Sequence, residues 1–130
     1  FLTDPKEALA AILLLDQFPR NMFRDEADGF STDPLALNIA KGAIEAGYDA
    51  SLTTEQRAFV YMPFMHSERM ADQDRSVELF DNLGQKQQLD YAIMHRDVIG
   101  RFGRFPHRNE ILGRESTNAE VEALSLGKGW

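Results

Sequence analysis

The signals for helix starts constrain this chain more than any other feature of its sequence. Asp4 precedes Pro5 and Asp33 precedes Pro34, which combines an N-cap residue with a proline in the first turn, where its missing N–H removes no hydrogen bond. No segment shows the alternation of apolar and polar residues that is typical of a strand. We therefore expect an all-α fold.

The remaining helix boundaries are marked by capping boxes and glycines. Thr53 with Gln56, and Thr117 with Glu120, have the spacing at which two side chains cap a helix start reciprocally. Glycines 47, 84 and 103 stand where helices should end. Pro63 is expected to kink or break the third helix. The expected segments are 5–18, 33–46, 54–62, 67–83, 85–102 and 117–124, five or six helices of roughly 10 to 18 residues in all.

Length and composition fit one domain, residues 1–130, built of stacked antiparallel helical hairpins. No apolar run approaches the roughly 18 residues that span a bilayer, so we expect no membrane partner. The chain has no cysteine, which excludes a disulfide scaffold, a thiolate nucleophile and cysteine-ligated metals. The absence of cysteine is consistent with a cytoplasmic location.

Charge is distributed unevenly along the chain. The whole carries a net charge of −7, but the stretch from His95 to Arg114 holds five arginines against Asp97 and Glu110, a net of +3, so the rest carries −10. An acidic body disfavours binding to nucleic acid, whose affinity comes from neutralising phosphates. The basic stretch indicates either a compact anion site or internal pairing with the acidic remainder.

Three segments are not routine helix or turn: 16–21, 61–68, and 95–97 together with 101–109. The first and third contain an internal echo, Phe-Pro-Arg-Asn at 18–21 and Phe-Pro-His-Arg-Asn at 105–109. In both, proline should end a helix, phenylalanine should anchor in the core, and Arg-Asn should lie in a loop. The alternative is purely structural, with the asparagine accepting a left-handed turn.

These three segments resemble the signature stretches of a bacterial domain-of-unknown-function family, DUF924, over about residues 5–124. The resemblance implies an all-α, tetratricopeptide-like superhelix and implies no activity. Family members usually carry a further N-terminal helical segment, so this chain is expected to lack it. Where members often have an acidic residue before the histidine of the second segment, this chain has Met65.

The histidines do not have the spacing of a metal site. His66 and Glu68 are two residues apart, which on a helix would point them in nearly opposite directions. His95 continues an apolar helix face and is expected to be a hydrogen-bonded core residue, and His107 lies in a loop beside arginines. We therefore predict neither a metal nor a cofactor.

The candidate site residues divide into donors and supports. Arg20, Arg104 and Arg108 are expected to bind an anion, with neutral hydrogen bonds from Asn21, His107 and Asn109. The supporting residues are Asp16, His66, Glu68, His95 and Arg96. Arg96 follows an inward stripe and should need Asp16 or Glu68 as its partner, whereas Arg101 should form a surface pair with Asp97. The alternative for these arginines is a structural ion-pair network.

Three functions are compatible with these residues. The leading hypothesis is a non-catalytic binding domain whose pocket holds an anionic small molecule or an acidic peptide end. The first alternative is a scaffold that binds a protein partner, with the basic residues structural. The second is a hydrolytic enzyme using His66 or His107 as general acid–base, although no catalytic motif is recognised.

Overall fold

The computed structural model describes residues 4–17, 19, 30 and 32–126, and these residues form helices and turns without any strand. Their α-helices are α1 (Pro5–Ile12), α3 (Asp33–Glu45), α4 (Thr54–Met65), α5 (Met70–Leu83), α6 (Lys86–Phe102) and α7 (Asn118–Ser125). A π-helical turn, η1 (Leu13–Gln17), continues α1, and two 3-10 turns are η3 (Tyr48–Ser51) and η4 (Pro106–Arg108). The all-α prediction is confirmed for this part of the chain.

The helix ends follow the capping signals. The Asp4 side chain accepts hydrogen bonds from the first turn of α1, and both predicted capping boxes are formed, at Thr53 for α4 and at Thr117 for α7. Glycine in the left-handed conformation follows α3 closely and ends α5 and α6, at Gly47, Gly84 and Gly103. These glycines supply a positive φ that other residues adopt only at a cost.

Three helix boundaries differ from expectation. Pro63 lies inside α4, which continues to Met65, so the predicted break at this proline is wrong. A proline this close to the end removes one backbone hydrogen bond, and the burial of Phe64 and Met65 offsets that loss. The first helix turns π-helical after Ile12, and α5 begins at Met70 rather than at residue 67. Helix α1 has eight residues, fewer than the predicted segment 5–18, whereas α7 has eight residues as the segment 117–124 does.

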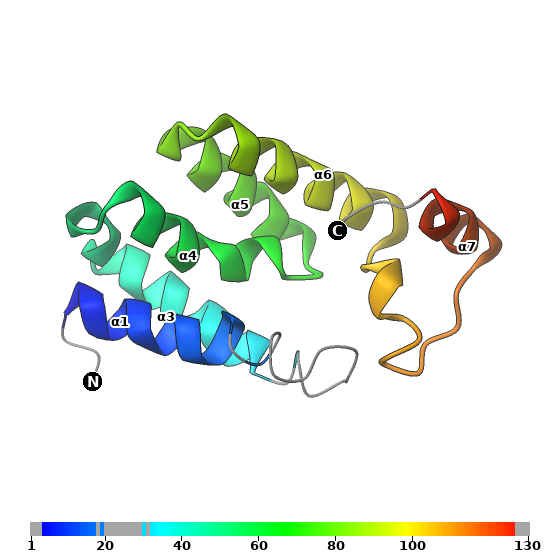
Figure 1. Ribbon diagram of the computed structural model, residues 1–130, viewed down its shortest axis with the longest axis horizontal. Helices are drawn as coiled ribbons and strands as arrows, with labels where there is room; N and C mark the ends of the chain where they lie inside the picture. Colours follow the sequence, from blue (N-terminus) through cyan, green and yellow to red (C-terminus); the bar gives the residue numbers. More distant parts are fainter. Residues whose placement is uncertain (1–3, 18, 20–29, 31, 127–130) are drawn as a thin grey trace.

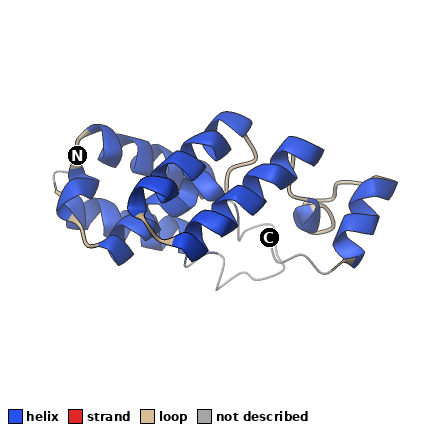
Figure 2. Ribbon diagram, turned by 90° about the horizontal axis from the view of Figure 1, so that it is seen from above, coloured by secondary structure: helices blue, strands red, loops and turns tan. Residues whose placement is uncertain are grey.

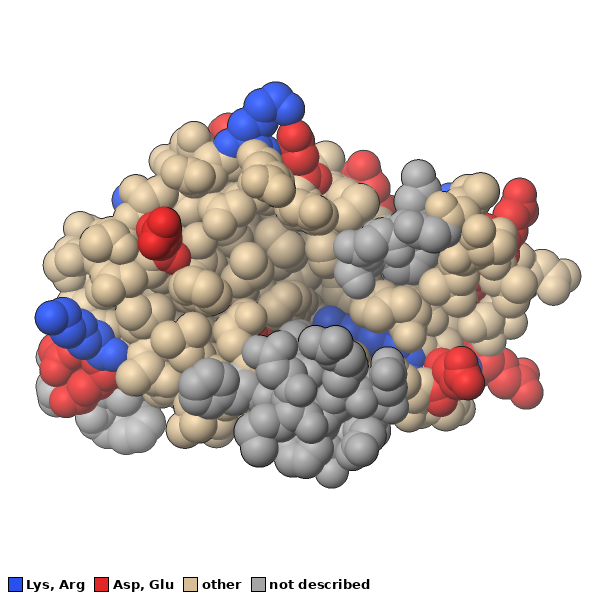
Figure 3. Space-filling view, viewed as in Figure 1, with Lys and Arg blue, Asp and Glu red and all other residues tan. Residues whose placement is uncertain are grey.

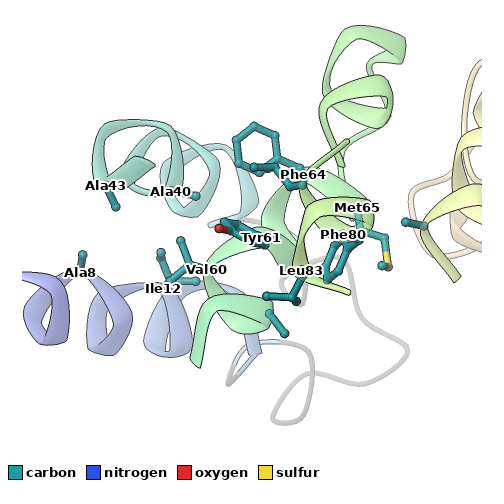
Figure 4. Packing of buried hydrophobic residues seen from close by; sticks show 13 residues of the cluster. Ala8, Ile12, Ala40, Ala43, Val60, Tyr61, Phe64, Met65, Phe80 and Leu83 are labelled. Carbon is teal, nitrogen blue, oxygen red and sulfur yellow. The ribbon is translucent and has the colours of Figure 1, made fainter. Parts of the chain in front are cut away.

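From α1 to α6, helices that follow one another in sequence also pack on one another (Figure 1). Helix α4 runs between the α1–α3 pair and the α5–α6 pair, and its buried side chains form the centre of the main hydrophobic core (Figure 4). Ala8 of α1 and the alanines Ala36, Ala40 and Ala43 of α3 are almost fully buried, and these small side chains let helices approach closely. The buried core residues other than alanine are Ile12, Val60, Tyr61, Phe64, Met65, Leu79, Phe80 and Leu83.

Residues 103–126, here called the C-terminal segment, lie at one end of the molecule (Figure 2). A separate small apolar cluster of Val98, Ile99 and Phe105, with Phe102 beside it, joins this segment to the end of α6. Among the described residues, no helix has the length and apolar character needed to cross a bilayer.

Candidate functional site

The turn between α4 and α5, residues 66–69, is the structural centre of the candidate site. The side chain of Gln73 in α5 is fully buried and supports this turn by hydrogen bonds. The Gln73 amide nitrogen lies 2.8 Å from the carbonyl oxygen of Met65 and 2.6 Å from that of Ser67. One side chain therefore caps the end of α4 and shapes the turn that follows.

Asp16 and His66 form a pair across this turn. Asp16 lies in η1 and is fully buried, and one of its carboxylate oxygens is 2.8 Å from Nδ1 of His66. The other oxygen accepts a hydrogen bond from the Gln17 side chain at 2.6 Å. The His66 side chain is 16% exposed, so the pair has one buried and one accessible end. The carboxylate thus sets the orientation of the imidazole ring.

Arg108 approaches the same turn from the C-terminal segment. It is buried, and its Nη2 donates to the main-chain carbonyl of His66 at 2.9 Å. Its guanidinium carbon lies 4.5 Å from the ring centre of Phe30 and 4.7 Å from that of Phe105. Because Phe105 is fully buried, η4 holds this charge in a defined place against the helical body.

Glu68 links the turn to the C-terminal segment. Its two oxygens accept hydrogen bonds from Arg114 at 2.9 and 3.1 Å, and one of them also accepts from the backbone N–H of Phe105 at 2.6 Å. Burial alone would raise the pKa of Glu68, but the bonds from Arg114 and the Phe105 N–H outweigh it and the pKa is lowered. Glu68 is therefore a charged structural link at neutral pH.

Two further histidines flank Phe105. His95 is buried, as the sequence predicted, with Nδ1 2.7 Å from the carbonyl oxygen of Tyr91 and its ring 5.5 Å from that of Phe105. Burial, with a smaller effect of the neighbouring Arg108 charge, lowers the pKa of His95 to about 4. His107 is exposed overall, but partial burial of its ring and the Arg108 charge lower its pKa to about 4 as well. Both rings are neutral near pH 7.

Arg104 and Asn109, both predicted as ligand donors, bond within the C-terminal segment. Arg104 makes two hydrogen bonds to the carboxylate of Glu120, at 2.9 and 2.8 Å, and Glu120 is almost fully buried. Asn109 is buried and contacts Ser116 and Arg114. Its φ of −60° is right-handed, so the alternative of a left-handed asparagine is wrong. For these residues the geometry matches the structural ion-pair alternative.

The predicted partners of two α6 arginines are not found. Asp16 and Glu68 bond the groups described above, and neither bonds Arg96. The stripe that Arg96 continues is only half-buried, so its guanidinium has no need of a buried carboxylate. Within the described residues, Arg101 lies over the Phe102 ring at 4.7 Å and forms no ion pair with Asp97. Arg20 and Asn21 lie outside the described residues.

A cavity of about 570 Å³, here called the turn cavity, opens beside these groups. It lies between α3, the α4–α5 turn and η4, where basic side chains show in the hollow next to the C-terminal segment (Figure 3). Its polar lining is Asp33, Asn38, Lys41, His66, Ser67, Glu68, Arg69 and Arg108. Its apolar lining is Phe30, Pro34, Leu37, Pro63 and Leu112. No group of three or more metal-ligating side chains occurs among the residues that the structure describes.

The sequence brought several of these residues to attention and missed others. Asp16, His66, Glu68 and Arg108 do meet around one turn, although they come from three distant segments. The roles of Arg114, Gln73 and Lys41 were missed. The sequence could have indicated Arg114 only through its place in the basic stretch. Gln73 and Lys41 are ordinary helix residues, and only the packing of the helices brings them to this turn.

The fold and the site define an all-α protein with a polar cavity at the turn between two helices. Residues 1–128 match the family described as bacterial protein of unknown function, DUF924, and the chain belongs to this family. A solved structure of a protein of unknown function from Agrobacterium tumefaciens, ATU0120, is 48% identical. It superimposes with a TM-score of 0.90, over 93% of this chain and 68% of that chain. No curated protein matches.

Proposed function

We propose that the chain is a binding domain for an anionic small molecule with an apolar part, which it holds in the turn cavity. The volume of about 570 Å³ is within the range of small-molecule sites, roughly 300–1,000 Å³. The carrying observation is Arg108, a buried guanidinium at the wall of a cavity that also has an apolar side. An anion in the cavity would meet a fixed positive charge that is little exposed to water, where charge-assisted hydrogen bonds are strong.

The donors in this proposal differ from those expected from the sequence. Arg108 remains the central donor, and Arg69, which is exposed at the cavity, is added to it. Lys41 lines the same cavity but already pairs with Asp72 at 3.1 Å. Arg104 and Asn109 support the segment that carries Arg108, because their bonds fix the chain around η4.

The first test is native mass spectrometry of the purified, untagged protein, compared with its denatured mass. A bound excess that matches an organic anion supports the proposal and identifies the ligand. An excess that matches an acidic peptide would favour the peptide-end alternative. No excess, together with no binding from a panel of mono- and dicarboxylates and phosphate esters, would favour the protein-interaction scaffold.

The second test uses variants and the ligand that the first test supplies. Arg69→Ala removes an exposed charge at the cavity and should weaken binding about tenfold, the scale of one charge-assisted contact of roughly 1.4 kcal/mol. Arg108→Gln should weaken it more. Arg101→Ala is the matched control, because Arg101 is an exposed arginine that does not line the turn cavity. Equal affinity in all three variants would refute the proposed donors.

A further inference from the structure

We propose that the ligand of the turn cavity is an elongated zwitterion, with a carboxylate at Arg69, an alkyl chain along α3 and an ammonium group at Glu45. This inference rests on the proposed binding function, because the carboxylate takes the anion position in the same cavity. Three observations carry it: a second cavity that adjoins the first, one charge in each cavity that no ion pair neutralises, and apolar side chains in both cavities.

The second cavity has a volume of about 270 Å³ and is here called the α3 cavity. Its lining is Lys41, Ile44, Glu45, Phe64, Asp72 and Arg75. Lys41 also lines the turn cavity, and its ammonium lies 3.1 Å from Asp72 of α5, so the two cavities meet where this pair bridges α3 and α5. Together they line α3 from Asp33 to Glu45, a length of about 18 Å. The α3 cavity alone is smaller than a typical small-molecule site of roughly 300–1,000 Å³, but it can hold the far end of a ligand that begins in the turn cavity.

Ion pairs account for the other charges of the α3 cavity and leave the charge of Glu45. Lys41 pairs with Asp72, and Arg75 pairs with Glu78 at 2.6 Å. Glu45 is exposed, and its carboxylate forms no ion pair with any residue that the structure describes. It is also the last residue of α3, where the helix's own carbonyl groups are partly negative, so a further negative charge is unfavourable there and a cation is favourable. The α3 cavity therefore suits a positively charged group.

The turn cavity has the opposite balance. Its Glu68 is bonded by Arg114. Arg69 is exposed, and in the described part of the chain its guanidinium forms no ion pair or hydrogen bond. With the bridging lysine pair and Glu68 set aside, Arg69 and Arg108 stand against Asp33, which leaves a net charge of +1 on the lining. A ligand that fills both cavities thus meets a positive charge at one end and a negative charge at the other.

Apolar side chains line both cavities along α3. Leu37 and Pro63 line the turn cavity, and Ile44 and Phe64 line the α3 cavity. Leu37 and Ile44 are two turns apart on the same helix, about 10 Å. A short peptide has the same terminal charges, but its peptide groups would lie against these apolar side chains at the cost of their hydrogen bonds to water. An ω-amino carboxylic acid with an unbranched alkyl chain is the chemical class that matches.

The experiment compares three eight-carbon acids that differ only at the end remote from the shared carboxylate. Octanoate ends in a methyl group, 8-aminooctanoate in an ammonium group and octanedioate in a second carboxylate. Dissociation constants are measured by isothermal titration calorimetry at pH 7. The wild-type protein should bind 8-aminooctanoate about fivefold more tightly than octanoate, the upper range for one solvent-exposed ion pair, and octanedioate should bind more weakly than octanoate.

Variants assign the two ends of the ligand. Glu45→Gln should bind octanoate and 8-aminooctanoate within twofold of each other, and Glu45→Lys should reverse the order, so that octanedioate binds most tightly. Arg69→Ala should weaken all three acids, because each presents a carboxylate at that end. Glu55→Gln is the matched control, because Glu55 is an exposed glutamate in the first turn of α4 that lines neither cavity, and it should keep the wild-type order.

The outcomes separate this inference from the proposed function. If octanoate binds and the amino group adds nothing, or if Glu45→Gln keeps the wild-type preference, the zwitterion is wrong while the anion site stands. If trialanine binds more tightly than 8-aminooctanoate, the ligand is a peptide and the alkyl chain is wrong. If none of the acids binds, the proposed class of ligand fails and the zwitterion fails with it.

Discussion

Replacing Glu68 with glutamine tests how strongly the C-terminal segment is attached to the helical body. The substitution keeps the size of the side chain and removes its charge. In the native protein the carboxylate accepts two bonds from Arg114 and one from the Phe105 N–H. A glutamine amide offers one acceptor oxygen, and its NH₂ group must face one of these donors.

The expected loss follows from the exposure of the partners. The side chains of Glu68 and Arg114 are 26% and 25% exposed, so water weakens their attraction, and we assign the ion pair about 1 kcal/mol. Phe105 is fully buried, and an N–H that loses its acceptor there costs about 1–2 kcal/mol. The sum is a decrease of about 2–3 kcal/mol in the free energy of unfolding.

Urea unfolding followed by circular dichroism measures this decrease. With a urea dependence of roughly 2 kcal/mol per molar, the midpoint should fall by about 1 M. Glu78→Gln is the matched control: Glu78 also pairs with an arginine, at 2.6 Å, but its side chain is 61% exposed, and the expected change is under about 0.5 kcal/mol. Equal shifts for the two variants would refute the view that Glu68 supports the attachment through its buried bonds.

The same variant has a predicted pH dependence. Because the folded pKa of Glu68 is lowered from 4.5, its contribution is complete above pH 4.5 and is lost as the pH falls through the folded pKa. The stability difference between wild type and Glu68→Gln should therefore be constant from pH 7 to about 5.5 and shrink below 4.5. A difference that does not change down to pH 3 would contradict the assignment.

Two further predictions concern Glu120 and His95. The Glu120→Ala variant loses the buried carboxylate that pairs with Arg104 and forms half of the α7 capping box, so hydrogen exchange of amides 118–125 should accelerate at least tenfold. Glu122→Ala is the control, because Glu122 lies on the same helix but is exposed, and exchange should not change. Equal acceleration in both variants would contradict the role of the Arg104–Glu120 pair. The NMR signals of the His95 ring should not titrate between pH 8 and 5.5, because its pKa in the folded protein is about 4. Protons then bind the unfolded chain more tightly, so His95 lowers the free energy of unfolding as the pH falls from 6.5 to 4. An NMR titration midpoint near pH 6.5 would show that the ring is solvated.

The helices could be predicted because their boundaries depend on neighbouring residues. Thr53 and Thr117 cap their helices with a partner three residues away, and Gly103 ends α6 through its own φ. The break predicted at Pro63 is wrong because the effect of this proline depends on whether the following residues are buried, which is a property of the packed core. The π-helical turn after Ile12 has no comparable local signal, and it is this turn that carries Asp16 inward.

The candidate site could be predicted only as a set of unusual segments. The residue types at Asp16, His66 and Arg108 drew attention, but their meeting depends on how η1, the α4–α5 turn and η4 pack. The basic stretch proved to contain both kinds of arginine: Arg104 and Arg114 pair internally, while Arg108 lines the cavity. Composition could not separate them, because packing decides which groups surround each guanidinium.

The hydrogen bonds from the Gln73 amide affect which residue types the turn after α4 can hold. Helices α5 and α6 end at a glycine with positive φ, and such a glycine also follows α3. In each of those turns, one residue therefore carries no functional group. After α4 the terminal carbonyls are bonded by Gln73 from the next helix, and none of residues 66–69 is glycine. The backbone there is supported from within the core, which leaves every residue of the turn able to present a functional group. A substitution of Gln73, which does not line the turn cavity, would thus change the backbone support of a turn that carries four functional side chains.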